Sequence, residues 1–266
     1  MSPIKYAAIT LDLEPDHAGQ VSESYHCWTN QNIKTLTSVL VKYNTPLSIF
    51  VVGKTLKIQS KYIRLLQRHK TSFHLHSYSH DLAYPETYSE IAKGKRIYQE
   101  FFQKDPIGYR APEGRISSQG LTHLKALNFK FDASFIPSFW PTPNRIFSPN
   151  HPHYLNDHKL LEIPFSTISP LKIPLSISWI RLMGWETFFK LLSYSTLPNQ
   201  LIFNFHLHDL FPTPSTKHLS TFWKLVYHRN QQQGLEYLKR TLHLLNKLGY
   251  KFVLIDDIYQ QRLQQQ

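Results

Sequence analysis

The sequence predicts an α/β protein built as a single barrel. Short apolar runs alternate with amphipathic helical patterns along most of the 266 residues, which is typical of repeated βα units. The chain is long for one ordinary domain, but α/β barrels reach this size as a single unit. We find no internal repeat and no linker that would separate two domains. With 41% hydrophobic residues the chain can bury a large core.

Strands are expected where short apolar runs are bounded by turn residues. The first, at residues 6–11, is apolar on both faces, and the second, at 46–53, begins at Pro46 and closes at Gly53. The last strand, at 251–255, follows a turn at Gly249. The remaining strands are expected at residues 73–76, 107–110, 129–132, 160–164 and 201–206.

Helices are expected where apolar residues recur three or four positions apart. Ile33, Leu36 and Leu40 follow this spacing after the first strand. The other helices are expected at residues 63–66, 88–102, 120–127 and 235–248. We expect the barrel to occupy residues 1–259, and the Gln-rich residues 260–266 to form a frayed tail.

Residues 165–198 are open to two interpretations. They carry Pro170, Pro174 and Pro198 around an apolar, helix-like stretch at 185–192. One interpretation is a barrel helix with a long loop. The other is an apolar lip that touches lipid or the acyl tail of a substrate.

Charge and cysteine content restrict the partners. The formal net charge is +12, but the 30 Lys and Arg residues are scattered and no nucleic-acid-binding module is present. The charge suits either a solubilising surface or attraction to a membrane face or a phosphate-bearing substrate. Cys27, the single cysteine, excludes an internal disulfide and a thiolate metal site. Because Met1–Lys5 leads directly into a strand without a signal-peptide pattern, we expect a cytoplasmic protein, in contact with a membrane at most peripherally.

The strongest chemical signal is His76-Ser77-Tyr78-Ser79-His80. Two histidines four residues apart can meet on one side of a helical turn, a common way to hold a divalent metal. With 15 histidines in the chain, such a pair also arises by chance. Its position directly after a predicted strand gives it weight, because α/β barrels place active-site loops there.

Carboxylates at the end of the first strand complement the histidine pair. Alternation along a strand puts Asp12 and Glu14 on the same side, with Asp16 beyond them. A metal held by two imidazoles needs a carboxylate as third ligand, and hydrolysis needs a second carboxylate that accepts a proton from water. This segment supplies both, with Glu14 or Asp16 as the ligand.

Three further segments follow predicted strands. Arg110, in Gly108-Tyr109-Arg110-Ala111-Pro112, can hold a carboxylate by a forked hydrogen bond. Asp132 and the segment of residues 204–209, with His206 and His208, offer an Asp–His pair in which the carboxylate orients an imidazole and favours its cation.

These motifs in this order resemble the polysaccharide deacetylase family of the NodB type, whose members are carbohydrate esterases that act on amino-sugar polymers. The likeness covers about residues 4–258, and its most specific part is the histidine motif. The branch with Asp-x-Glu in the first motif and Arg-Ala-Pro in the third is the most similar; it includes intracellular members linked to surface-glycan assembly. The matching segments are Thr10-Leu11-Asp12, His76-Ser77-Tyr78-Ser79-His80, Arg110-Ala111-Pro112, Asp132-Ala133-Ser134 and Phe205-His206, with support from residues 49–53, 162–164 and 252–258.

The resemblance implies a distorted (β/α)7-type barrel related to the TIM barrel, and a role for each motif residue. Asp12 would be the general base, steadied by Arg110. Asp132 would tune the histidine of the fifth motif, which acts as general acid. His206 is preferred because it ends the apolar strand, and His208, followed by Asp209, also fits the family's common His-Asp ending. The implied metal ligands are Glu14, His76 and His80.

The chain departs from the family pattern at two positions. Many members carry adjacent aspartates in the first motif, the second of which binds metal, whereas Leu13 stands here. The metal role must therefore pass to Glu14 or Asp16. The third motif continues with Glu113, a carboxylate that would oppose an anionic substrate.

We therefore expect metal-dependent hydrolysis of N-acetyl groups on an amino-sugar glycan or a lipid-linked glycan precursor. Zinc suits two imidazoles and one carboxylate, and cobalt or nickel would accept the same ligands. The net charge and the apolar residues Trp179, Ile180 and Trp185 suit a membrane-attached substrate. Two rivals stay open: an amidohydrolase of small cyclic amides or imides on the same fold, and a non-catalytic glycan-binding homologue. The sequence does not predict the oligomeric state.

Overall fold

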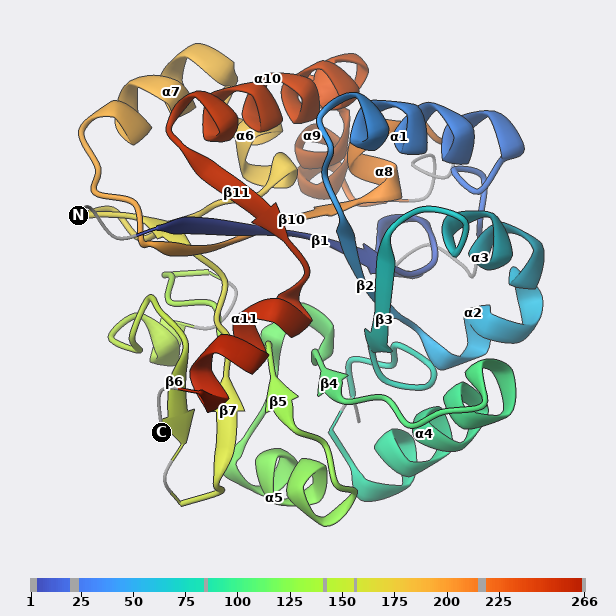
Figure 1. The fold of residues 1–266 in the computed structure, drawn as a ribbon. Helices are drawn as coiled ribbons and strands as arrows, with labels where there is room; N and C mark the ends of the chain where they lie inside the picture. The colour runs from blue at the N-terminus through green and yellow to red at the C-terminus, as the bar shows by residue number, and fades with distance from the viewer. Residues whose placement is uncertain are drawn as a thin grey trace.

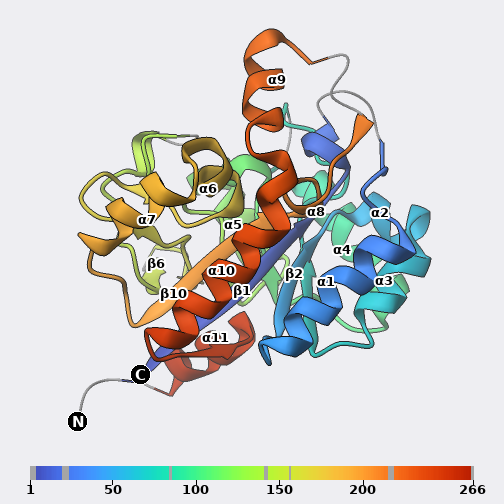
Figure 2. The ribbon, with the colours of Figure 1, turned by 90° about the horizontal axis from the view of Figure 1, so that it is seen from above.

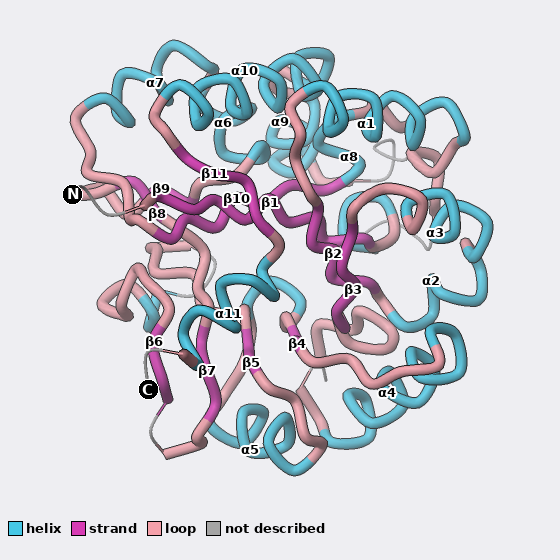
Figure 3. Tube along the Cα trace, in the orientation of Figure 1, coloured by secondary structure: helices cyan, strands magenta, loops and turns pink. Residues whose placement is uncertain are grey.

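Seen in a computed structural model, the chain folds around one large sheet, with most helices outside it (Figures 1 and 3). The structure describes residues 4–19, 24–83, 86–140, 143–155, 157–214 and 219–264. The strands are β1 (Lys5–Leu13), β2 (Leu47–Val51), β3 (Thr71–Leu75), β4 (Gly108–Tyr109), β5 (Phe131–Asp132), β6 (His153–Leu155), β7 (Leu160–Glu162), β8 (Thr167–Ile168), β9 (Ile173–Pro174), β10 (Gln200–His206) and β11 (Tyr250–Val253).

Helices connect successive strands, as βα units require. Among the described residues, none of them has both the length and the apolar character needed to cross a membrane. In chain order they are α1 (Asn30–Lys42), α2 (Gly53–Ile58), α3 (Ser60–Leu66), α4 (Tyr88–Phe102), α5 (Ser118–Ala126), α6 (Ile177–Met183), α7 (Trp185–Ser193), α8 (Leu207–Leu210), α9 (Thr221–His228), α10 (Gly234–Lys247) and α11 (Ile255–Leu263).

The strand order identifies a distorted barrel. The order is β10-β1-β2-β3-β4-β5-β7-β6, with β11 also pairing β1, and every pair is parallel except β6–β7. One edge of β1 is shared, because Lys5–Ala8 pairs with β11 and Thr10–Leu13 pairs with β2. The predicted fold class, a distorted barrel of the (β/α)7 type, is confirmed.

The segment after β7 spans the open side of the barrel. Ser166 N–H donates to the carbonyl of Ile202 in β10 at 3.2 Å, and Ile202 N–H donates to Ser166 Oγ at 2.9 Å. Further along, Asn204 N–H donates to the carbonyl of Leu175. These bonds join the chain beyond β7 to β10 and bring the two ends of the sheet together.

Alternation along the strands sends one set of side chains toward the helices and the other toward the barrel interior. In β1, Ile9 and Leu11 belong to the large cluster that includes the buried faces of the helices. Ala8 belongs to a second cluster, with Phe50 and Ile202. Thr10 and Asp12 follow Ala8 at the same period of two, so the interior changes from apolar to polar toward the carboxyl ends of the strands.

Helix α11 covers the opposite, amino-terminal end of the barrel (Figure 1). Ile255 and Ile258 join the interior cluster, and Ile255 N–H donates to Ser48 Oγ at 2.8 Å. Asp256 Oδ2 lies 3.1 Å from Nε2 of the buried His74. Helix α11 thus covers one end of the interior, and the predicted site residues lie at the other end, at the carboxyl ends of the strands.

The strongly periodic elements were predicted well. Helix α4 has the predicted bounds, and its N-cap Thr87 accepts a hydrogen bond from Glu90 N–H, a contact worth about 1 kcal/mol. Two predicted strand ends are wrong, because Gly53 begins α2 and Ile255 begins α11.

The predicted C-terminal tail needs a correction. Residues 260–263 continue α11, which is anchored through its buried Ile255 and Ile258. Residues 265–266 and Met1–Pro3 lie outside the described part of the chain. A polar, Gln-rich composition concealed the helix because only two of its residues are buried.

Residues 165–198 contain the predicted helix and, before it, a second helix. Helix α7 forms as predicted, with Phe188 and Leu192 buried, and the Trp185 ring stacks on Tyr237 of α10 at 6.1 Å. The preceding helix α6, which the sequence did not predict, carries Trp179 toward the interior opening.

Candidate active site

A cavity of about 410 Å³ lies at the carboxyl ends of β1, β3, β4 and β10. Parallel strands that end at one edge bring distant residues together there. Every residue of the predicted site except Asp132 lines this cavity. The predicted residues that line it are Asp12, Glu14, His76, His80, Arg110, His206 and His208.

Glu14, His76 and His80 converge on one point. Glu14 Oε2 lies 3.3 Å from His76 Nε2 and 2.8 Å from His80 Nε2, and one donor atom from each residue lies within 4.8 Å of the other two. All three side chains are buried. His76 Nδ1 donates to the carbonyl of Arg110 at 2.8 Å, so in the neutral ring the lone pair is on Nε2, facing Glu14.

The two histidines do not lie on a helical turn, which corrects the predicted local structure. Ser77 and His80 have φ values of 58° and 64°, in the left-handed region that side chains seldom adopt. His80 N–H donates to Ser77 Oγ at 3.0 Å. The reversal of the backbone, rather than helical periodicity, returns His80 to His76, with ring centroids 5.1 Å apart.

A carboxylate from α4, Glu90, anchors this loop. Glu90 Oε1 accepts hydrogen bonds from the backbone of Tyr78 and Ser79 and from Ser79 Oγ, at 2.5 to 3.1 Å. The sequence analysis missed Glu90 because an acidic residue in the first turn of a helix is common and does not by itself indicate a role at a site. Its contacts offset the strained turn at Ser77 and His80.

Asp12 is held on both carboxylate oxygens. Arg110 Nη1 contacts Oδ1 at 2.6 Å, and Asn204 Nδ2 donates to Oδ2 at 3.0 Å. The Arg110 guanidinium is fully buried between the rings of Phe50 and Phe165, at 3.9 and 4.3 Å from their centroids. The structure therefore places Arg110 against Asp12.

Asn204 is a site residue that the sequence analysis missed. It lies in the middle of β10, where every other residue of 201–205 is apolar. A single buried amide in such a strand requires hydrogen-bond partners, so its position in the sequence could have identified Asn204 as a candidate site residue. Its Oδ1 accepts from Thr10 Oγ1 at 2.7 Å and from Arg110 Nη1 at 3.0 Å.

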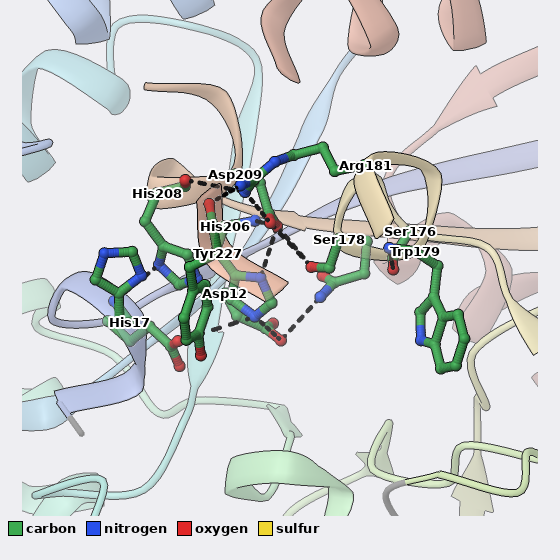
Figure 4. Close-up of polar contacts among 12 residues, drawn as sticks. Asp12, His17, Ser176, Ser178, Trp179, Arg181, His206, His208, Asp209 and Tyr227 are labelled. Carbon is green, nitrogen blue, oxygen red and sulfur yellow. Dashed lines mark hydrogen bonds and ion pairs between the residues drawn. The ribbon is translucent and has the colours of Figure 1, made fainter. Parts of the chain in front are cut away.

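His206 lies at the cavity with its two ring nitrogens facing different acids. Nε2 is 3.8 Å from Asp12 Oδ2 and 3.9 Å from Glu14 Oε1, while Nδ1 bonds Asp209 Oδ2 at 2.9 Å (Figure 4). Asp209 is also held by Arg181 Nη1 at 3.2 Å and by Ser178 Oγ. Arg181 is itself buried, and its Nη2 donates to the carbonyl of Tyr227.

The expected contact between Asp132 and the histidine of the fifth motif is not formed. Asp132 Oδ1 accepts from Ser134 Oγ at 2.6 Å, and the side chain of Asp132 bonds that of Glu162. Both carboxyl groups are fully buried. Burial raises the pKa of Glu162 well above its ordinary value, and the charge of Asp132 adds to this effect. The role predicted for Asp132 falls geometrically to Asp209, three residues after His206.

His208 differs from His206 in its surroundings. His208 Nδ1 accepts the backbone N–H of His17 at 3.2 Å, and the ring stacks on His206 at 4.8 Å. Burial lowers the pKa of His208 well below its ordinary value, and the charge of His206 lowers it further. His208 is therefore neutral at ordinary pH and unsuited to donate a proton. His206, His208 and Asp209 form a second cluster of possible metal donors, but the contacts given above already engage each of them.

The two groups that face each other across the candidate metal site have opposite charges. Burial would raise the pKa of Glu14, but the imidazoles of His80 and His206 outweigh it and hold the pKa well below its usual range. Burial would lower the pKa of His206, but Glu14, Asp209 and Asp12 outweigh it and raise the pKa to about 9. Glu14 is thus a carboxylate and His206 an imidazolium near neutral pH.

The alternative ligand, Asp16, is directed elsewhere. Its carboxylate accepts from the backbone N–H groups of His26 and Cys27 and from Thr213 Oγ1, at 2.6 to 3.3 Å. These bonds fix the loop after β1. Among the described residues, Glu14 is the carboxylate that lies beside both histidines of the 76–80 motif.

The donor set fits a divalent cation. Two imidazoles and one carboxylate are a common protein ligand set for zinc, leaving a fourth position open. His80 Nδ1 has no hydrogen-bond partner among the described residues, although the ring is buried, and Nε2 faces Glu14 Oε2 at 2.8 Å. An imidazole aimed at a carboxylate in this way suits coordination of a cation between them. Glu113 also lines the cavity, and it pairs with Arg115 Nη2 at 2.8 Å, which offsets its charge.

Comparisons with known proteins agree with this architecture. The sequence model of the family described as polysaccharide deacetylase matches residues 2–131. No curated protein matches the sequence. A structure from Mycobacterium smegmatis, provisionally described as a polysaccharide deacetylase, is 16% identical, with a TM-score of 0.61 over 100% of this chain and 95% of its own.

Two further structures are similar in fold. The Bc1960 peptidoglycan N-acetylglucosamine deacetylase is 15% identical, with a TM-score of 0.58 over 96% of this chain and 88% of its own. A carbohydrate esterase 4 family pseudoenzyme from Bacillus anthracis is 12% identical, with a TM-score of 0.58 over 96% of this chain and 66% of its own. Identities this low establish the shared fold alone. The family match over residues 2–131, together with this shared fold, makes the chain similar to the polysaccharide deacetylase family.

Proposed function

We propose that the protein is a metal-dependent hydrolase that removes N-acetyl groups from an amino-sugar glycan or glycolipid precursor. The observation that carries the proposal is the convergence, in one cavity, of a His–His–Glu donor set with a buried carboxylate and an imidazolium. Metal-assisted amide hydrolysis needs these three components.

Zinc is the metal that we propose, held by Glu14, His76 and His80. Cobalt and nickel satisfy the same ligands. When bound, such a cation supplies Lewis-acid polarisation of the acyl carbonyl and of the attacking water. Because the ligand imidazoles must be neutral, loading the site requires His80 to lose the proton that Glu14 favours on it.

The chain's own residues supply the proton transfers. Asp12, fixed on both oxygens by Arg110 and Asn204, is oriented to accept a proton from water in the cavity. His206 Nε2 lies on the same side, 3.8 Å from Asp12, and it donates a proton to the departing sugar amine. Asp209 holds the His206 ring in place through Nδ1.

A non-catalytic role is the second candidate, because a specific observation favours it. The fold is shared with a pseudoenzyme from the carbohydrate esterase 4 family. Leu13 also replaces the second aspartate that many family members carry. Leu13 is fully buried in the core cluster, whereas Glu14 faces the two histidines. A carboxylate therefore remains available to the metal site one position later.

The test pairs elemental analysis with acetate release from N-acetylglucosamine oligosaccharides. His80→Ala should lose both bound metal and acetate release, and the exposed His243→Ala should keep both. Metal-stripped protein that releases acetate at the full rate would refute the metal-dependent scheme. Hydrolysis of a cyclic amide or imide by that protein would favour the small-amide alternative. Bound metal without acetate release from any of these glycans would favour the glycan-binding alternative.

A further inference from the structure

The cavity has a second wall with a different chemistry. It faces the histidines and acids described above, and it is apolar. Its main side chains are Ile136, Trp140, Trp179, Leu182, Trp223 and Val226. Since 14% of the chain is aromatic, aromatic side chains near a site are no surprise, but three of the five tryptophans line this one cavity.

Three polar side chains that also line the cavity are engaged within the protein. Ser178 Oγ donates to Asp209, Ser176 Oγ accepts from Trp179 N–H as the N-cap of α6, and Glu113 pairs with Arg115. Figure 4 shows Ser178 directed at Asp209 and Trp179 on the far side of Ser176. Because these polar groups already have partners, this part of the cavity presents mainly apolar surface.

The apolar wall continues outward past the cavity. Helix α9 stands at the edge of the molecule (Figure 2) and turns Trp223, Val226 and Tyr227 toward the cavity. The Trp223 ring lies 6.4 Å from that of Trp140, which is 51% exposed. Leu225 on the same helix is 64% exposed. Among the described residues, apolar side chains therefore extend from the cavity to the surface at Trp140, Trp223 and Leu225.

We propose that the acylated amino sugar carries an apolar alkyl chain that lies against the apolar lining of the cavity, chiefly Trp140 and Trp223, with Trp179 in the same cavity. This proposal rests on the proposed function and specifies its substrate class. The occupant is an alkyl chain because it gains from burial against aromatic faces and asks for no hydrogen-bond partner. The cavity is continuous with the metal ligands, so the sugar and the chain occupy it together.

Calorimetric binding of two simple glycosides tests the proposal. Methyl and octyl N-acetyl-β-glucosaminide, the latter below its critical micelle concentration, are titrated into metal-loaded and metal-stripped protein. Each buried methylene contributes about fourfold in affinity. If half of the seven additional methylenes are covered, the octyl glycoside binds about 100-fold more tightly. Trp223→Ala and Trp140→Ala should each reduce that preference about tenfold or more, and Tyr194→Ala, which alters an exposed ring outside the cavity, should not.

Each contrary outcome has a distinct meaning. Equal affinity for the two glycosides, or a preference that survives both tryptophan substitutions, would overturn the proposal. A third result would also overturn it: the protein sediments with phosphatidylglycerol vesicles, the tryptophan substitutions abolish that sedimentation, and neither glycoside is preferred. The wall would then bind a bilayer. A tryptophan-dependent octyl preference without acetate release would leave the apolar subsite standing and remove the deacetylase function.

Discussion

The substitution Asp209→Asn removes a negative charge that stabilises the protonated form of His206, the proposed proton donor. Asp209 Oδ2 bonds His206 Nδ1 at 2.9 Å, and it is one of three acids that raise the pKa of His206 to about 9 against the opposing effect of burial. A hydrogen bond to a charged group is worth about 1.5–3 kcal/mol, and one pKa unit corresponds to about 1.4 kcal/mol. The substitution should therefore lower the pKa of His206 by about one to two units.

The assay is the pH dependence of kcat/KM for acetate release. His206 must be protonated to donate, so activity falls as the pH rises through its pKa. In Asp209→Asn this alkaline limb should move to lower pH by about one to two units. A bound cation offsets the charge of Glu14 and lowers the pKa in both proteins, so the difference between them is the quantity to compare.

Ser178→Ala is the matched control. It removes the hydroxyl that donates to both oxygens of Asp209 but keeps the charge, so the limb should move by less than about half a unit. Breaking the buried pair with Arg181 costs about 3–5 kcal/mol, so both variants are assayed well below their melting temperatures. An unmoved alkaline limb in folded Asp209→Asn would refute the assignment of His206 as the donor.

Three further substitutions follow from the same contacts. Asp12→Asn should lower kcat/KM by about 10²- to 10⁴-fold and leave metal content unchanged by elemental analysis; loss of the metal would mean that Asp12 is a ligand. Burial raises the pKa of Glu162 well above its ordinary value. The protonated side chain contributes its full stability to the fold below the ordinary pKa, and this contribution is lost as the pH rises through the raised pKa. Glu162→Gln keeps the oxygen that accepts from Phe135 N–H. The urea midpoint of this variant should rise relative to that of the parent protein between pH 5 and 8. A difference between the two midpoints that stays constant with pH would count against a raised pKa of Glu162. A Cβ at Gly234 would lie 1.8 Å from the carbonyl oxygen of Asp209, so Gly234→Ala should cost about 3 kcal/mol or more in urea unfolding, and an unchanged midpoint would contradict this contact.

Local patterns were sufficient for the regular elements and for the convergence of the first and second motifs. Helix α4 and strand β1 have strong periodicity or continuous apolar runs, and parallel strands bring their carboxyl ends to one edge. The meeting of the first-strand carboxylates with His76 and His80 follows from this geometry, whereas the choice of Glu14 over Asp16 comes from the structure. The short helix α9 was not predicted, because its apolar residues face a cavity rather than the core.

The parts that failed depend on backbone conformation or on long-range polar contacts. Spacing alone suggested a helical turn between His76 and His80, but left-handed residues make the loop. The sequence analysis expected Asp132 to hold His206. Sequence order does not reveal that the side chain of Asp132 bonds that of Glu162 instead. Asp209 lies in the predicted segment of residues 204–209, and only the fold shows that it bonds His206.

Metal stoichiometry and affinity test the central claim most directly. The account predicts about one divalent ion per chain in the purified protein, and at least about a 100-fold loss of zinc affinity in Glu14→Gln. Asp16→Asn, which alters the neighbouring carboxylate bound to backbone N–H groups, should keep the metal if it folds. Unchanged zinc affinity in folded Glu14→Gln, or loss of zinc in folded Asp16→Asn alone, would contradict the site built from Glu14, His76 and His80.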